Sequence, residues 1–206
     1  MSDYDNPRAI IFLVPTEPID FFPDATFPSE HGVERSEELA LELTERDLRP
    51  AIGFALGDQM SYWTAKLILQ GVGCETDPLS CPEFQRFASG TMNLHATLHI
   101  FKGRPTGETL SDLLPQETNI CYWLIDNLTC LLSANSRKIA DRVVLVVGPP
   151  HLVSSVRKSA APAWATPQQR ARQPNHFGCG EGVVVEYGTS GNPNVSDTIR
   201  RPPPPP

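Results

Sequence analysis

Two histidines, His95 and His99, are the residues whose type and spacing first suggest chemistry in this chain. On a helix, histidines at this spacing lie one turn apart and can share a metal ion. Here, however, apolar and polar residues alternate from Thr91 to Lys102, a pattern typical of a β-strand. On a strand the two histidines are roughly 13 Å apart, which is too far for one ion. The sequence therefore predicts neither a metal site nor a bound cofactor.

His95 also begins the pattern His-x-Thr-hydrophobic, which Thr97 and Leu98 complete. This pattern resembles one half of the signature of the 2H phosphoesterases, enzymes that cleave or rearrange RNA and cyclic-nucleotide phosphates. The resemblance implies that His95 acts as a general acid or base and that the Thr97 hydroxyl helps to hold the phosphate. It also implies a second, facing motif. The sequence lacks that motif, because neither His151 nor His176 is followed two positions later by a hydroxyl residue.

Polar residues follow three of the predicted strands, at the position where open α/β sheets bind ligands. They are residues 16–17 (Thr-Glu), 58–59 (Asp-Gln) and 148–151 (Gly-Pro-Pro-His). The last of these stands before a predicted helix, whose exposed N–H groups could hold an anion. Its two prolines have no N–H to donate, so we interpret that segment as an ordinary turn.

The chain ends on two arginines and five prolines. A basic residue before a PxxP core fits the grooves of SH3-like domains, and a polyproline II segment loses little conformational entropy on binding. We therefore assign Arg200, Arg201, Pro203 and Pro206 as candidate partner-binding residues, with a protein as the partner. The alternative is a low-complexity end that binds nothing.

Charge is unevenly distributed along the chain. The net charge is −7, but residues 1–58 contain 13 acids against 4 bases, whereas residues 136–206 contain 4 acids against 9 bases. A basic segment can hold phosphate or nucleic acid, or it can fold back on the acidic part of its own chain. The bases are scattered, so we favour the second interpretation and leave nucleic-acid binding open.

The five cysteines form no C-x-x-C pair, and the acidic N-terminus is unlike a signal peptide. These features predict an intracellular, most simply cytoplasmic, protein with reduced cysteines. Cys121 and Cys130 lie in an apolar segment, which predicts buried free thiols. The longest apolar stretch, residues 51–72, contains Asp58 and Lys66, so we expect no membrane span.

Hydrophobic periodicity predicts an alternation of strands and helices. The predicted strands are residues 8–14, 51–56, 91–102, 142–147 and 183–187. The predicted helices are a segment from an N-cap at Ser36 to Pro50, followed by 61–70, 120–132 and 152–158, with 120–132 as the central helix.

This order predicts an α/β fold with a mostly parallel sheet of four to five strands and helices on both faces. We expect one domain over residues 1–158, a flexible linker over 159–181, and an edge strand or unpaired strand over 182–188. Residues 189–206 are expected to form a disordered, proline-ended tail, because they have little apolar surface to offset the entropy of ordering.

Because the sequence contains no complete catalytic or cofactor-binding set, we interpret the protein as a non-catalytic interaction or regulatory protein whose tail is a polyproline ligand. The alternative is a 2H-like phosphoesterase that acts through His95 and Thr97.

Overall fold

The computed structural model describes seven segments of the chain: residues 7–17, 27–56, 59–81, 142–148, 150–159, 177–187 and 193–201. In chain order the elements are β1 (Ala9–Leu13), α1 (Glu30–Glu45), β2 (Pro50–Leu56), α2 (Gln59–Gly71), β3 (Leu79–Cys81), β4 (Val143–Val147), α7 (Pro150–Ser159), β5 (Gly182–Tyr187) and β6 (Pro193–Ile199).

The strands form one sheet in the order β3-β2-β4-β1-β5-β6. The pairs β2–β3, β2–β4 and β1–β4 are parallel, whereas β5 is antiparallel to both β1 and β6. The α/β class and the mostly parallel sheet predicted from the sequence are therefore confirmed. The three apolar runs that predicted the strands at 8–14, 51–56 and 142–147 form β1, β2 and β4, side by side.

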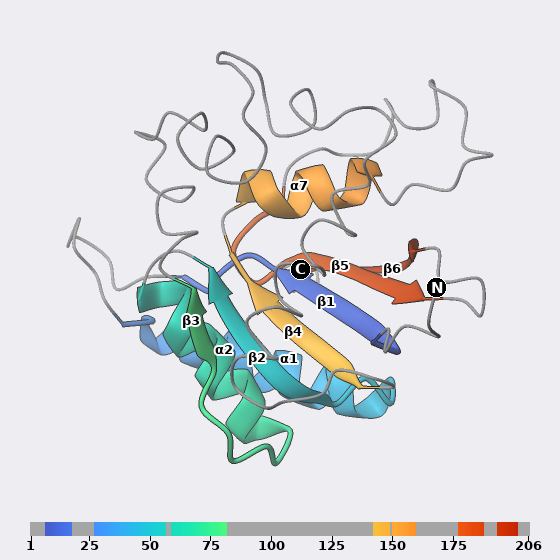
Figure 1. Cartoon of the computed structure of the whole chain (residues 1–206). Helices are drawn as coiled ribbons and strands as arrows, with labels where there is room; N and C mark the ends of the chain where they lie inside the picture. The colour runs from blue at the N-terminus through green and yellow to red at the C-terminus, as the bar shows by residue number, and fades with distance from the viewer. Residues whose placement is uncertain are drawn as a thin grey trace, which may run out of the picture.

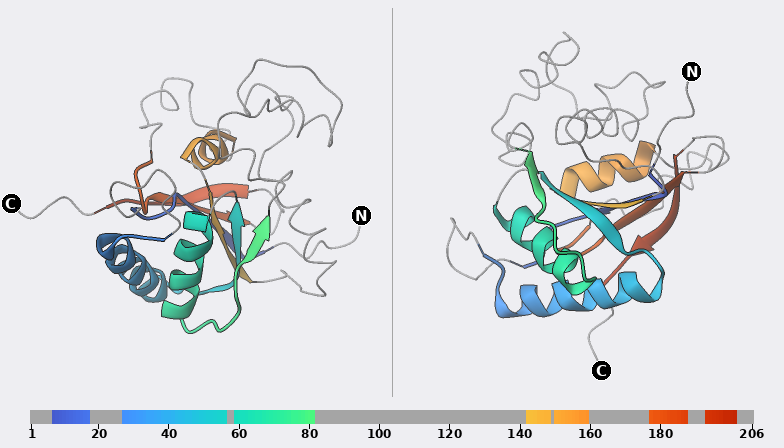
Figure 2. Two further views of the ribbon diagram at one scale, coloured as in Figure 1. Left: turned by 90° about the vertical axis from the view of Figure 1, so that its left-hand side faces the viewer. Right: turned by 60° about the horizontal axis from the view of Figure 1, so that its bottom comes forward.

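Helices cover both faces of this sheet, as predicted. Helices α1 and α2 lie together on one face and α7 lies on the other (Figures 1 and 2). Every residue of β1 and of β4 is buried, because both faces of these central strands are covered. This burial explains why both strands are continuous apolar runs rather than alternating ones. On one face, Leu39 and Leu43 of α1 and Ile68 of α2 are fully buried in the core.

Helix α1 begins earlier than the sequence pattern predicted. The N-cap is Ser29, whose side chain accepts a hydrogen bond from the Gly32 N–H, and Ser36 lies inside the helix. The Ser36 hydroxyl donates to the Gly32 carbonyl at 2.8 Å. The prediction of Ser36 as N-cap was wrong because it placed Gly32 in the preceding loop, although the first turn of this helix accommodates a glycine.

The two C-terminal strands differ from the expectation. Strand β5 pairs with both β1 and β6, so it is an internal strand, neither an edge strand nor an unpaired one. Residues 193–199, which we expected to be disordered, form β6, and Ile199 is fully buried. The expectation weighed only apolar surface, whereas a strand at the sheet edge also gains a ladder of backbone hydrogen bonds with its neighbour.

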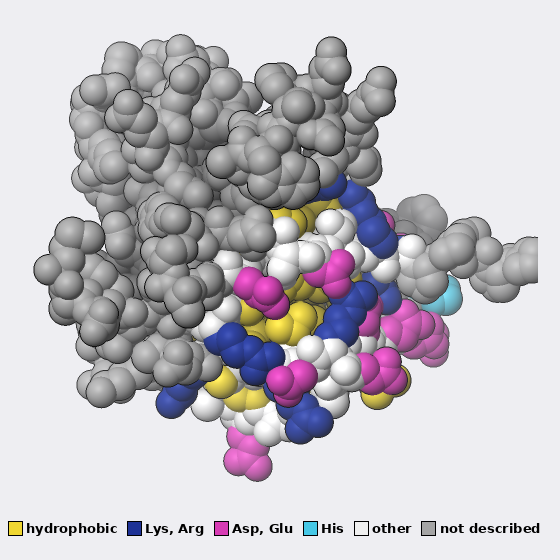
Figure 3. Space-filling view, turned by 90° about the vertical axis from the view of Figure 1, so that its right-hand side faces the viewer, with side chains coloured by type: hydrophobic (Ala, Val, Ile, Leu, Met, Phe, Trp, Pro, Cys, Tyr) yellow, Lys and Arg dark blue, Asp and Glu magenta, His cyan; other side chains and the backbone are white. Residues whose placement is uncertain are grey.

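Opposite charges are interspersed on the surface that forms the right-hand side of the view in Figure 1 (Figure 3). Arg46 of α1 contacts Asp197 of β6 at 2.5 Å, and Arg8 contacts Asp47 at 3.0 Å. These pairs join parts of the chain that are far apart in sequence.

Several predicted features lie outside the described residues. They are the strand at 91–102, the helix at 120–132, Cys121 and Cys130, most of the linker at 159–181, and the five terminal prolines. Within the described part of the chain, no helix is long and apolar enough to cross a membrane.

Candidate functional site

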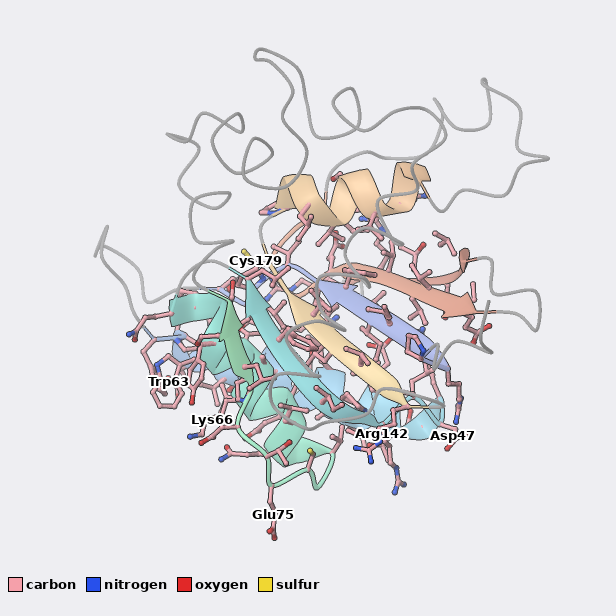
Figure 4. All side chains as sticks on the ribbon, in the orientation of Figure 1. Asp47, Trp63, Lys66, Glu75, Arg142 and Cys179 are labelled. Carbon is pink, nitrogen blue, oxygen red and sulfur yellow. The ribbon has the colours of Figure 1, made fainter. Side chains whose placement is uncertain are left out.

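The parallel strands β1, β2 and β4 end at the same side of the sheet, which we call the carboxyl edge. Cys179 lies at this edge, whereas Asp47 and Arg142 lie at the opposite end of the sheet (Figure 4). The strands are held together here, since the Gly148 N–H after β4 donates to the Leu13 carbonyl of β1 at 2.9 Å. The edge therefore collects the three strand ends that the sequence marked as candidate ligand sites.

Thr16, three residues beyond the end of β1, lies in a buried cluster of hydroxyl groups. Its hydroxyl lies 3.1 Å from that of Thr64 in α2 and 3.3 Å from that of Ser36 in α1. The Thr16 N–H also donates to the Thr64 hydroxyl at 3.1 Å. All three side chains are buried. The cluster therefore ties the end of β1 to both helices, and Thr16 is not exposed to an incoming ligand.

Glu17 follows the buried Thr16, and its side chain is 37% exposed. Its carbonyl accepts hydrogen bonds from the Ser29 N–H at 3.0 Å and from the Ser29 hydroxyl at 3.2 Å, which fix its backbone against the start of α1. Its carboxylate accepts a hydrogen bond from the Arg201 guanidinium. A carboxylate and a guanidinium thus lie together in the open part of the carboxyl edge.

Glu181 holds Arg200 and Arg201, the two residues after β6, at the carboxyl edge. One oxygen of the Glu181 carboxylate accepts from the Arg200 guanidinium at 2.7 Å and from the Gly178 N–H at 2.9 Å; the other accepts from the Arg201 N–H at 3.2 Å. Burial by itself would raise the pKa of Glu181, but these hydrogen bonds and the charge of Arg200 outweigh it and lower the pKa below its usual value. We call Glu181, Arg200 and Arg201 the C-terminal clasp.

Arg35 of α1 also holds the backbone of the C-terminal clasp. Its guanidinium donates to the Arg200 carbonyl at 3.4 Å and to the Gly180 carbonyl at 3.3 Å, and it pairs with Glu38 at 3.1 Å. The Arg35 side chain is only 7% exposed. It therefore acts as a structural cation that holds two chain segments on α1, and it is too enclosed to meet a ligand.

Cys179 is a half-buried free thiol at the same edge. Burial and the nearby Glu17 carboxylate raise the pKa of its thiol, and the Arg201 charge only partly opposes them. A raised pKa keeps the thiol protonated at neutral pH, so Cys179 is a poor nucleophile. Because the charges of both Glu17 and Arg201 act on this thiol, its reactivity reports on that ion pair.

Two of the five histidines lie in described segments. His31 is exposed in the first turn of α1 and contacts Glu34 at 3.2 Å. His151 is the second residue of α7, which begins directly beyond β4 at the carboxyl edge. Among the residues that the structure describes, no three His, Cys, Asp or Glu side chains are grouped as metal ligands.

The sequence-predicted site residues have separate outcomes. His95, Thr97, Pro203 and Pro206 lie outside the described residues, so binding of a protein partner by the tail stays a prediction. Arg200 and Arg201 are described, and they contact acids of their own chain. Arg201 contacts Glu17 of the acidic N-terminal part, as the favoured interpretation of the charge distribution expects, whereas Arg200 contacts Glu181 of the basic segment itself.

Sequence reasoning missed two residues of this edge, Glu181 and Cys179. Neither belongs to a motif, and both lie at the end of the segment 159–181 that we interpreted as a flexible linker. The only signal was the division of charge between the two ends of the chain, which does not identify individual partners.

Comparison with known proteins relates the whole arrangement to one group of enzymes. Neither a protein-family model nor a curated protein sequence matches the chain. Among solved structures, it is similar to a protein from Agrobacterium tumefaciens assigned as the phosphohistidine phosphatase SixA. The TM-score is 0.52 at 12% identity, covering 95% of this chain and 100% of that one.

Two further structures agree. A mycobacterial glucosyl-3-phosphoglycerate phosphatase has a TM-score of 0.51 at 14% identity, covering 91% of this chain and 95% of that one. A protein from Escherichia coli assigned as an α-ribazole-5′-phosphate phosphatase has a TM-score of 0.51 at 11% identity, covering 95% and 98%. The fold of the chain therefore matches that of phosphoglycerate mutase-like phosphatases.

This result corrects both functional interpretations drawn from the sequence. The prediction of a non-catalytic interaction or regulatory protein with a polyproline tail was wrong, because the chain has the fold of a group of phosphatases. The 2H-like alternative is not supported either, because the similar structures are named as phosphatases and none of those cited is named as a 2H phosphoesterase. The sequence reasoning failed because it searched for a complete local motif, whereas the resemblance lies in the arrangement of the elements.

Proposed function

We propose that this protein binds phosphate monoesters at the carboxyl edge and hydrolyses them. The observation that carries the proposal is the similarity of its fold, over more than nine-tenths of the chain, to structures named as phosphatases. The carboxyl ends of β1, β2 and β4 meet at this edge, where open α/β sheets place their ligands. A guanidinium at the same edge supplies charge of the sign that a phosphoryl group requires.

His151 is the residue that we assign to proton transfer, because it opens α7 beside the end of β4. An imidazole changes its protonation near neutral pH, so it can act as both base and acid. In the proposed reaction a water oxygen bonds to phosphorus and the ester P–O bond breaks, while a proton passes from the water to the leaving oxygen.

The test is release of inorganic phosphate from p-nitrophenyl phosphate, phosphoserine and a phosphohistidine peptide, measured with His151→Asn and His31→Asn variants. His31 is a matched control because it is exposed on α1, where its imidazole contacts Glu34. We expect turnover by the wild-type protein, a loss of about 100-fold or more in His151→Asn, and no change in His31→Asn. Undetectable turnover of all three substrates would refute hydrolysis. Turnover that His151→Asn leaves intact would refute the assigned residue.

Binding is measured separately from turnover. A calorimetric titration with inorganic phosphate should give saturable binding to the wild-type protein at constant ionic strength. Absence of binding to phosphate and to every substrate would refute the proposed site as well as the proposed reaction.

A further inference from the structure

Arg201 has a fixed backbone and an exposed guanidinium group. Its backbone is held because the Arg201 N–H donates to Glu181 at 3.2 Å and because the preceding residue is held by Glu181 and Arg35. Its side chain is 49% exposed and contacts the Glu17 carboxylate. A guanidinium presents five N–H donors in a planar fork that matches carboxylate and phosphate oxygens. The clasp therefore positions an anion-binding group at the carboxyl edge.

The partner of this guanidinium is an internal anion. Glu17 directly follows Thr16, whose backbone is tied to α2, so the carboxylate extends from a fixed part of the edge. The two residues are 184 positions apart, and they meet only because β6 and the clasp bring the end of the chain to the end of β1. An exposed carboxylate on an arginine is held weakly, because water and salt screen the interaction. An anion with more oxygens and more charge can replace it.

Burial separates Arg201 from the other arginine of the clasp region. Arg35 is enclosed and already donates to Glu38 and to two backbone carbonyls. A ligand that replaced these partners of Arg35 would break the contact between α1 and the segment around Gly180. Arg201 can change partners by moving only its side chain.

We propose that Arg201 is the phosphoryl-binding cation of this site and that the Glu17 carboxylate occupies the place of the ligand's anionic group until the ligand arrives. The ligand exchanges with Glu17 on the guanidinium, and the clasp keeps the Arg201 backbone in position throughout. This inference rests on the proposed phosphate site and adds the residue that recognises the phosphoryl group. It places a determinant of binding at the C-terminal end of the described chain.

The test is calorimetric titration of inorganic phosphate into the full-length protein and four variants at constant ionic strength. Arg201→Ala should weaken binding about tenfold, which corresponds to losing one charge-assisted hydrogen-bonding group. Arg201→Lys should weaken it roughly threefold, because it keeps the charge but not the planar fork. Glu17→Gln should tighten binding roughly threefold, because it removes the competing negative charge.

Arg8→Ala is the matched control. Arg8 is 50% exposed and pairs with Asp47 at 3.0 Å, so it loses the same kind of exposed ion pair at the opposite end of the sheet. Its phosphate affinity should equal that of the wild-type protein. An equal loss of affinity in Arg8→Ala and Arg201→Ala would overturn the inference, since it would indicate a general effect of net charge.

Labelling of the Cys179 thiol gives a second measurement of phosphate binding that does not rely on calorimetry. Cys179 lies between Gly178 and Gly180, whose backbone groups bond to Glu181 and Arg35, so a phosphate ion bound to Arg201 should shield its thiol from a thiol reagent. Labelling is followed by peptide mass spectrometry, with Cys74 as the internal reference because it lies beyond α2 and hydrogen-bonds to the Ala51 carbonyl. Phosphate should slow labelling of Cys179 and leave Cys74 unchanged.

The outcomes separate this inference from the proposed function. If the wild-type protein binds no phosphate, the proposed site fails. If it binds phosphate but Arg201→Ala binds equally well, or Glu17→Gln binds more weakly, the role given to Arg201 fails while the proposed site stands. Each variant is checked for folding by thermal denaturation, and Arg201→Lys gives a graded result where Arg201→Ala does not fold.

Discussion

The structure makes a quantitative prediction for Ile199, the last residue of β6. This side chain is fully buried and belongs to the same apolar cluster as Leu39 and Leu43 of α1 and Val184 of β5. It therefore joins the C-terminal strand to the core on the face that α1 and α2 cover. A tail without structure would tolerate any substitution at this position.

The size of the effect follows from the atoms removed. Ile199→Ala deletes three carbon atoms, and each buried CH₂-sized group contributes about 0.8 kcal/mol of transfer free energy. The cavity that remains adds to this cost, since neighbouring strands relax only partly. We expect the free energy of unfolding to fall by about 3 kcal/mol, which is a large fraction of the roughly 5–15 kcal/mol typical of a domain.

The assay is urea denaturation of the full chain, followed by far-ultraviolet circular dichroism. With a slope of about 2 kcal/mol per molar urea, the midpoint should fall by roughly 1.5 M. Val195→Ala is the matched control, because Val195 lies on the same strand with a partly exposed side chain. It should cost less than about 1 kcal/mol.

The reasoning is refuted if Ile199→Ala and Val195→Ala shift the midpoint equally, or if neither shifts it. Either result would mean that β6 is not docked on the core, and that the C-terminal clasp is not held at the carboxyl edge by the sheet.

Three further substitutions test other parts of the fold. Gly182→Ala should destabilise the protein by at least about 2 kcal/mol in the same assay, because an added Cβ would lie 2.0 Å from the Phe12 carbonyl oxygen; a neutral effect would show that β5 does not pair closely with β1. Thr16→Val should cost about 1–2 kcal/mol, since it removes a buried hydroxyl that contacts Thr64 at 3.1 Å, whereas Thr16→Ser should cost less. For Glu181 the lowered pKa means that the folded protein favours the ionised carboxylate, so this contribution is present above the ordinary value of 4.5 and is lost as the pH falls through the lower, folded value. The stability difference between wild-type protein and Glu181→Gln should therefore shrink below that pH, and a difference that grows on acidification would contradict the sign.

The clasp also connects stability to the proposed function. Ile199, the last residue of β6, directly precedes Arg200 and Arg201. Unfolding of β6 should therefore also remove the Arg201 guanidinium from the carboxyl edge. Ile199→Ala should thus weaken phosphate binding in proportion to its unfolded fraction only, because the guanidinium itself is unchanged in molecules that remain folded.

Much of the sheet was determined by local sequence alone. The apolar run from Arg8 to Val14 and the one from Arg142 to Val147 became β1 and β4, because strands covered on both faces must be apolar at every position. The helix predicted over 61–70 became α2 with small changes at its ends. The prediction of a ligand site at the carboxyl ends of these strands likewise needed only the parallel order of the strands, and it stays a prediction.

Tertiary structure decided the remainder. Ser29 rather than Ser36 caps α1, because the Glu17 carbonyl, 12 positions earlier in the chain, accepts from Ser29, and the sequence of one helix does not reveal such a contact. Strand β6 forms because β5 offers a free edge and the core has space for Ile199. The pairing of Arg201 with Glu17 spans nearly the whole chain. Hydrophobic periodicity is a property of neighbouring residues, whereas ion pairs and sheet edges depend on which distant segments the fold brings together.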